Sequence, residues 1–220
     1  MAARNRHRSI PALSLGGLAA ILAFSLGTPG EKSDVEEWSF VREHIVMEVG
    51  QGEFQIDAKY VFKVERKTDD LIILYPFPTD STLGRPILLN AWIDSGRGRE
   101  PLHVLQQIQG WYWLMSAESA AKIEVGIRFR QAMKESRAVY VLRSAAIWDR
   151  PLEEATLEVR VPRGRRAIIQ PKMVAAENLG EFECHRVIFK NWTPGEDLVV
   201  TLTQPGEPHS KSLKGLPLTP

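Results

Sequence analysis

The strongest constraint in this sequence is a run of strict alternation between Phe54 and Val64. Every second position of the run is apolar: Phe54, Ile56, Ala58, Tyr60, Phe62 and Val64. The positions between them are mostly polar, as at Asp57 and Lys59. A period of two places alternate side chains on opposite faces of an extended chain, so the run predicts a strand with one face in a core. A strand that is half exposed in this way is typical of an antiparallel sheet.

The same period recurs along most of the chain. Further strands are predicted at 71–75, 87–93, 103–108, 111–115, 122–130, 138–142, 156–161, 182–189 and 198–202. Turn-forming residues separate many of them, as at 162–164 and 191–197. No segment has the pattern of a capped amphipathic helix. The sequence therefore predicts an all-β fold, most economically an antiparallel β-sandwich.

An internal repeat is a further hypothesis. Segments 55–63 and 122–130 share one alternation, and each is followed after a similar interval by an Arg-Pro pair, at 85–86 and 150–151. This indicates two related β units, 36–115 and 116–204. The alternative is that any two alternating strands look alike.

The N-terminal segment has the layout of an export signal. Three arginines precede an uncharged, largely apolar run of 18 residues, and Ser25 and Gly27 suit the small positions before a cleavage site. We expect residues 1–27 to be a signal peptide and the protein to be periplasmic or extracellular. An uncleaved membrane anchor is the alternative, since a spanning helix needs about 20 apolar residues. Residues 205–220, rich in Pro, Gly and Ser, predict a disordered tail.

Charge and cysteine content exclude some partners and some sources of stability. Removal of residues 1–27 leaves 25 Lys and Arg against 27 Asp and Glu. A chain without a basic excess is a poor partner for nucleic acid. The single Cys184 excludes an intramolecular disulfide. At 220 residues and 44% apolar content, the chain can instead rely on one sizeable packed core.

Recognisable catalytic motifs are absent from the sequence. It contains no common hydrolase elbow, zinc-protease helix or glycine-rich phosphate loop. Cys184 and His185 are neighbours, but adjacent side chains of a strand point to opposite faces. His44, His103 and His185 lack the spacing of metal ligands. We expect no metal, no cofactor and no catalytic residue; an exported hydrolase that pairs one of these histidines with a carboxylate is the alternative.

Aromatic residues are better candidates for binding. Trp111, Tyr112 and Trp113 alternate along one strand, so at least one large ring is free for a partner if that strand is half exposed. Tyr75 and Phe77 each precede a proline, where a strand must end or become an edge because proline donates no ladder hydrogen bond. For all five residues core packing is the favoured interpretation, and binding is the alternative.

A basic loop is the remaining candidate surface. Arg163, Arg165 and Arg166 lie within VPRGRR and would suit an anionic lipid or polysaccharide, although such a loop is by default a solvated rim. Together these features favour an exported, non-enzymatic module that binds another envelope component, expected to be a protein. A carrier that holds an apolar ligand between its sheets is a further alternative.

Four segments together resemble a family of exported bacterial proteins. They are the alternating run 52–62, YPFP at 75–78, IWDRPLEEATLEVRVP at 147–162 and NWTPGEDLVVTL at 191–202. Their order is similar to that in exported β-sandwich proteins of the DUF4424 type and to the strand pattern of the vault-protein-inter-alpha-trypsin domain. The likeness covers most of residues 41–203. The resemblance implies that the protein is a scaffold in the cell envelope. It supplies no catalytic residue for this chain.

Overall fold

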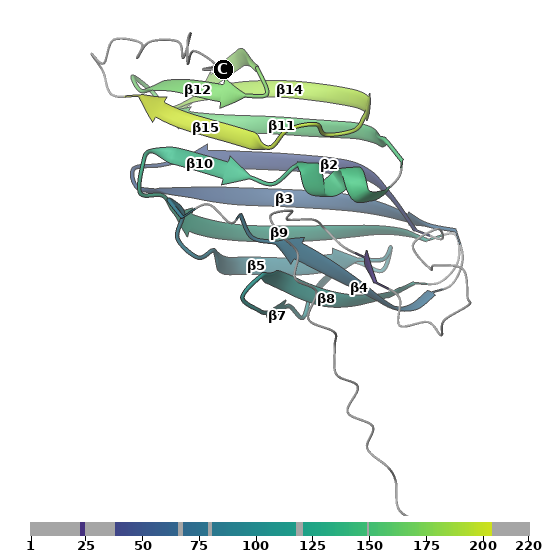
Figure 1. The fold of residues 1–220 in the computed structure, drawn as a ribbon. Helices are drawn as coiled ribbons and strands as arrows, with labels where there is room; N and C mark the ends of the chain where they lie inside the picture. Colours follow the sequence, from purple (N-terminus) through teal and green to yellow (C-terminus); the bar gives the residue numbers. More distant parts are fainter. Residues whose placement is uncertain are drawn as a thin grey trace, which may run out of the picture.

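The computed structural model describes residues 23–24, 38–65, 68–78, 81–117, 121–148 and 150–203. These residues form strands β1 to β15 and one short 3₁₀ helix, η2 (Arg143–Trp148). The all-β prediction is confirmed, and Figure 1 shows two layers of sheet packed face to face. The predicted tail at 205–220 lies outside the described residues, as does the predicted signal segment except for Ala23–Phe24.

One eight-stranded sheet forms the first layer, in the order β13-β14-β11-β2-β3-β9-β5-β6. Its strands are β2 (Trp38–Val49), β3 (Glu53–Val64), β5 (Ile87–Asp94), β6 (Arg99–Pro101), β9 (Lys122–Ala132), β11 (Leu152–Pro162), β13 (Val174–Leu179) and β14 (Phe182–Trp192). Neighbouring strands are antiparallel, as predicted, with one exception: β11 and β2 run parallel.

Two smaller sheets form the second layer. One has the order β1-β4-β8-β7 and the other β10-β15-β12. Their strands are β1 (Ala23–Phe24), β4 (Thr68–Pro76), β7 (Leu105–Gln106), β8 (Gly110–Ala117), β10 (Arg137–Tyr140), β12 (Arg166–Gln170) and β15 (Leu198–Thr203). In Figure 1 the three-stranded sheet lies over β14, β11 and β2, and the four-stranded sheet lies over β9 and β5.

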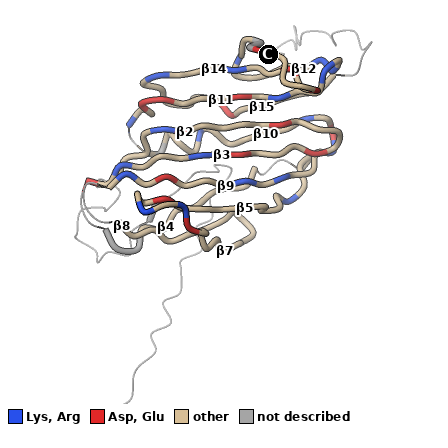
Figure 2. The backbone as a smooth tube through the Cα atoms, turned by 180° about the vertical axis from the view of Figure 1, so that it is seen from behind, with Lys and Arg blue, Asp and Glu red and all other residues tan. Residues whose placement is uncertain are grey.

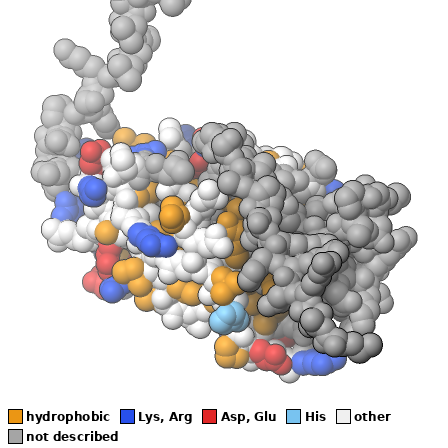
Figure 3. Space-filling model, turned by 60° about the horizontal axis from the view of Figure 1, so that its bottom comes forward, with side chains coloured by type: hydrophobic (Ala, Val, Ile, Leu, Met, Phe, Trp, Pro, Cys, Tyr) orange, Lys and Arg blue, Asp and Glu red, His pale blue; other side chains and the backbone are white. Residues whose placement is uncertain are grey.

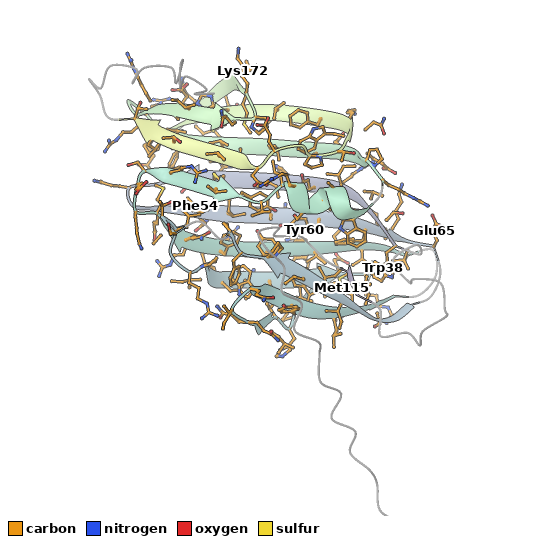
Figure 4. The ribbon with its side chains drawn as sticks, viewed as in Figure 1. Trp38, Phe54, Tyr60, Glu65, Met115 and Lys172 are labelled. Carbon is orange, nitrogen blue, oxygen red and sulfur yellow. The ribbon has the colours of Figure 1, made fainter. Side chains whose placement is uncertain are left out.

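The hydrophobic core lies between the two layers. The six alternating apolar residues of β3 are each at most 2% exposed, which confirms the strand predicted there. Figure 4 labels Phe54, Tyr60 and Met115, which belong to this core. Burial of apolar area of this kind is the main favourable contribution to folding.

The two predicted β units contribute strands to a single sheet. The similar segments 55–63 and 122–130 lie in β3 and β9, which are antiparallel neighbours. β9 also pairs with β5, and β11 pairs with β2 across the boundary between the units. Residues of both units belong to one core cluster. The repeat, and the boundaries 36–115 and 116–204, stay a prediction.

The structure corrects the predicted strands in three places. Within 103–108 only Leu105–Gln106 forms a strand, while β6 precedes it at Arg99–Pro101. β12 and β13 were not predicted from the sequence, because both are short edge strands with a weak apolar period. η2 adds a helical turn after β10. These are edge strands and connections, whose side chains have few core contacts to impose a pattern.

Candidate functional site

Four of the five aromatic binding candidates lie in the core. Trp111 and Trp113 are 0% and 2% exposed, and Tyr75 and Phe77 are also buried. Tyr75 stacks on Trp111 with ring centroids 5.6 Å apart, and Phe77 meets Trp111 edge-on at 4.9 Å. These four residues therefore pack in the core, as the favoured interpretation expected, and do not form a surface contact. β4 ends at Pro76, as the proline pattern predicted.

The fifth candidate, Tyr112, belongs to an exposed apolar surface on the second layer. It pairs with Leu105 on β7, and its strand neighbour Leu114 pairs with Ile72 on β4. Leu105 and Leu114 are 51% and 56% exposed, and Ile108 between the two strands is 91% exposed. We call Ile72, Leu105, Ile108, Tyr112 and Leu114 the apolar patch. Figure 3, which brings the lower side of Figure 1 forward, shows hydrophobic side chains exposed at several places on this face.

A tight turn between β7 and β8 carries part of the apolar patch. The Gln107 amide donates to the Gly110 carbonyl at 2.9 Å, which closes the turn and leaves Ile108 at its tip. A Cβ at Gly110 would lie 2.2 Å from the Tyr75 carbonyl oxygen, so only glycine lets β8 approach β4 this closely. These two contacts therefore define the backbone of the hairpin that carries the exposed apolar side chains.

One edge of β4 pairs with β8. The other edge pairs with β1, a short strand from the N-terminal apolar run. Ala23 pairs with Ile73 and Phe24 with Ile72. Cleavage after Gly27, as the signal pattern predicts, would remove β1 and leave the edge of β4 opposite β8 without a partner strand. An open strand edge of this kind is a template for another chain.

The predicted basic loop lies at the opposite end of the molecule. Arg163, Arg165 and Arg166 are exposed at the turn from β11 to β12, where Gly164 has a φ of 79°. The Arg165 amide donates to the Pro162 carbonyl at 3.1 Å. Within the described part of the chain these three arginines form no ion pair, so the loop is an exposed cluster of positive charge.

His44, His103 and His185 are not brought together. His44 is half-buried on β2, where burial lowers its pKa, as does the nearby Lys59. His103 is exposed between β6 and β7, and His185 on β14 has Glu183 3.5 Å from its Nε2. No group of three potential metal ligands occurs among the residues that the structure describes. Cys184 is buried while His185 is partly exposed.

A buried polar cluster was not predicted from the sequence. Tyr60, Tyr75 and Tyr140 come from three different sheets, and the hydroxyl oxygens of Tyr60 and Tyr140 are 2.6 Å apart. Glu43 lies opposite Tyr60 on β2 and is 5% exposed. Burial raises the pKa of Glu43 to about 8, so the carboxyl is mostly protonated at neutral pH. The sequence did indicate this burial, because Glu43 has the same alternation as Ile45 and Met47, whose side chains are buried in the core.

Comparison with known proteins supports the fold of this chain but assigns the chain to no family. No protein family and no curated protein matches the chain. The solved structure of a candidate nutrient-binding protein of Legionella pneumophila superposes with a TM-score of 0.54 at 12% identity, covering 84% of this chain and 70% of that one. At this identity the likeness shows the fold alone.

A second similar structure is larger. An M1 zinc metallopeptidase of Deinococcus radiodurans superposes with a TM-score of 0.49 at 11% identity. The match covers 75% of this chain and 42% of the metallopeptidase. Among the described residues, no helix has the length and apolar character needed to cross a membrane.

Proposed function

We propose that this protein is an exported, non-enzymatic β-sandwich module that binds an envelope protein through the apolar patch and the adjoining edge of β4. The exposed apolar side chains of the β7–β8 hairpin are the observation that carries the proposal. Three large aliphatic residues between positions 105 and 114 are each more than half exposed. Contiguous apolar surface on a soluble protein is typical of a contact with another macromolecule.

The edge of β4 supplies a backbone route to the same partner. β1 shows that Ile72 and Ile73 accept an added antiparallel strand. An extended segment of a partner would make the same ladder hydrogen bonds, and its side chains would lie against Ile72 and Leu114. Backbone pairing would provide affinity, and the apolar side chains would provide selectivity.

The enzyme alternative has less support. His44, His103 and His185 lie in separate elements, and the carboxylate beside His185 belongs to the same strand. The basic loop at Arg163, Arg165 and Arg166 favours a second, electrostatic contact with an anionic lipid or polysaccharide, since it is exposed and unpaired within the described residues.

The test is cross-linking in intact cells with the full-length tagged chain, followed by affinity purification and mass spectrometry. Leu114→Lys and Leu105→Lys place a charge in the patch. Ile188→Lys is the matched control, because Ile188 is 55% exposed on β14, away from the patch. We expect one envelope protein to be recovered with the wild type and with Ile188→Lys, and to be lost with both patch variants.

Two results would overturn the proposal. The first is equal recovery of every cross-linked protein with the patch variants and with Ile188→Lys. The second is the absence of any reproducible protein partner in the wild-type eluate. Thermal unfolding of each variant distinguishes lost binding from lost folding, since all three substituted side chains are at least half exposed and should leave stability nearly unchanged.

A further inference from the structure

A pocket of about 390 Å³ lies on the outer face of the eight-stranded sheet. It is built over β3, β9, β5 and β6, and among its lining residues are Asp57, Lys59, Asn90, Trp92 and Arg99. Figure 2 views this face and shows basic and acidic positions along β3 and β9. The size is within the range of small-molecule sites.

The indole of Trp92 lies directly on the backbone of β9. Trp92 and Gly126 are register partners, and a Cβ at Gly126 would lie 2.1 Å from Cε2 of the indole. Arg99 covers the Trp92 ring, with its guanidinium carbon 4.1 Å from the ring centroid. Stacking uses the flat face of a guanidinium and leaves its in-plane N–H groups available to a ligand.

Ion pairing differs among the three cations of the pocket. Arg128 donates from Nε to Oδ2 of Asp57 at 3.0 Å, so these two charges compensate each other. Lys59 and Arg99 form no ion pair with any described carboxylate. Lys59 is the register partner of Gly126, which places it on the same face of the sheet as Trp92. Two cations without an ion pair to a described carboxylate therefore share one pocket.

Several other cations of this sheet face are paired. Lys63 pairs with Glu153, Lys190 with Glu154 at 3.2 Å, and Arg160 with Glu158 at 2.9 Å. Lys59 and Arg99 differ from these three cations in having no ion pair with a described carboxylate.

We propose that this pocket binds a small polar carboxylate, with the carboxylate group held between Arg99 and Lys59. Lys59, Arg99 and Arg128 against Asp57 and Glu100 leave a formal charge of one positive unit, which suits the single negative charge of a carboxylate group better than a phosphate dianion. A planar carboxylate also matches the fork of a guanidinium. Glu100 and Asn90 suit a hydrogen-bond donor on the ligand, such as a hydroxyl or an ammonium group.

The test is calorimetric titration of the full-length chain with D-glucuronate, L-serine, D-glucose and inorganic phosphate. Glucuronate and serine are a sugar acid and an amino acid, so they separate two sources of the same chemistry. Glucose is the neutral counterpart of glucuronate. We expect saturable binding of glucuronate or serine and no binding of glucose, with phosphate binding at least ten-fold more weakly than the carboxylate.

Three variants locate the site. Arg99→Gln and Lys59→Gln should each weaken carboxylate binding by ten-fold or more, because each removes one uncompensated charge. Lys63→Gln is the matched control on β3, since Lys63 already pairs with Glu153 and does not line the pocket. Arg99→Lys keeps the charge and tests the fork geometry; it should retain part of the affinity.

The proposal is overturned if neither carboxylate binds the wild type, or if both bind Arg99→Gln and Lys59→Gln as well as Lys63→Gln. Circular dichroism of each variant checks that the fold is retained. The pocket is on the first layer and the apolar patch is on the second. A negative result for carboxylate binding therefore leaves the proposed protein contact untouched, and the reverse is also true.

Discussion

The hydroxyl oxygens of Tyr60 and Tyr140 lie 2.6 Å apart across two different sheets. Tyr60 belongs to the eight-stranded sheet and Tyr140 to the three-stranded sheet. Their rings are also close to Tyr75 of the four-stranded sheet, with centroids 6.4 Å from Tyr75 in both cases. The three tyrosines therefore connect the three sheets at one point of the core.

Tyr140→Phe should destabilise the protein by about 1–2 kcal/mol, because it removes one hydroxyl of a buried pair and with it the hydrogen bond between Tyr60 and Tyr140. The measurement is urea unfolding followed by circular dichroism. Tyr112→Phe is the control, since Tyr112 is half-buried on the outer side of β8. Equal midpoints for the two variants would show that the hydroxyl pair contributes nothing measurable.

Glu43 should make the protein less stable as the pH rises from about 4.5 to about 8. Burial raises the pKa of Glu43 to about 8 in the folded state, so the folded protein keeps a proton that the unfolded chain loses above its ordinary pKa of 4.5. The free energy of unfolding then falls with pH, with a limiting slope of about 1 kcal/mol per pH unit from this group.

Glu43→Gln removes that slope. We expect unfolding free energies measured in urea at pH 5, 6, 7 and 8 to converge between wild type and variant at low pH and to diverge in favour of the variant at high pH. Parallel curves would contradict the burial of an ionisable carboxyl at this position.

Gly126→Ala should destabilise the protein by about 1–3 kcal/mol, the usual cost of overpacking, because the added methyl overlaps the Trp92 indole. The indole must then leave the backbone of β9, and its stack with Arg99 is lost. Unfolding in urea and the chemical shift of the Trp92 indole N–H report the two effects. Gly195→Ala is the control, since nothing lies within 4 Å of the position of its Cβ.

Glu158→Gln should destabilise the protein by about 1–3 kcal/mol at neutral pH, because it removes a nearly buried charge that two arginines bind. The Glu158 side chain is 4% exposed, with Arg160 Nη2 at 2.9 Å and Arg186 Nη2 at 2.5 Å. Glu154→Gln, on the same strand and with Lys190 as its partner, should cost under about 0.5 kcal/mol because that pair is exposed to solvent.

The lowered pKa of Glu158 predicts that the protein loses stability in acid. Burial alone would raise the pKa of Glu158, but hydrogen bonds from Arg186 and Arg160 outweigh it and lower the pKa. Its contribution is thus complete above the ordinary pKa of 4.5 and disappears as the pH falls through the lower, folded value. Wild type and Glu158→Gln should therefore approach each other in unfolding free energy below pH 4. A constant difference down to that pH would contradict the lowered pKa.

Local alternation was enough to determine the class of fold and most strands. The six inward residues of β3 and the end of β4 at Pro76 follow from rules that involve only neighbouring positions: a period of two and the missing amide of proline. The weak patterns of β12 and β13 were missed because exposed edge strands have little core to select their residues.

Long-range packing decided the rest. The parallel pairing of β2 with β11 joins segments far apart in the chain. Both faces of 111–115 are apolar, so its alternation alone could not show that Trp111 and Trp113 face the core while Tyr112 and Leu114 remain outside. The sheet register brings Trp92 over Gly126, and three separate sheets bring the tyrosines together. Such contacts depend on which strands become neighbours, and that is determined by the burial of the whole chain and not by any local period.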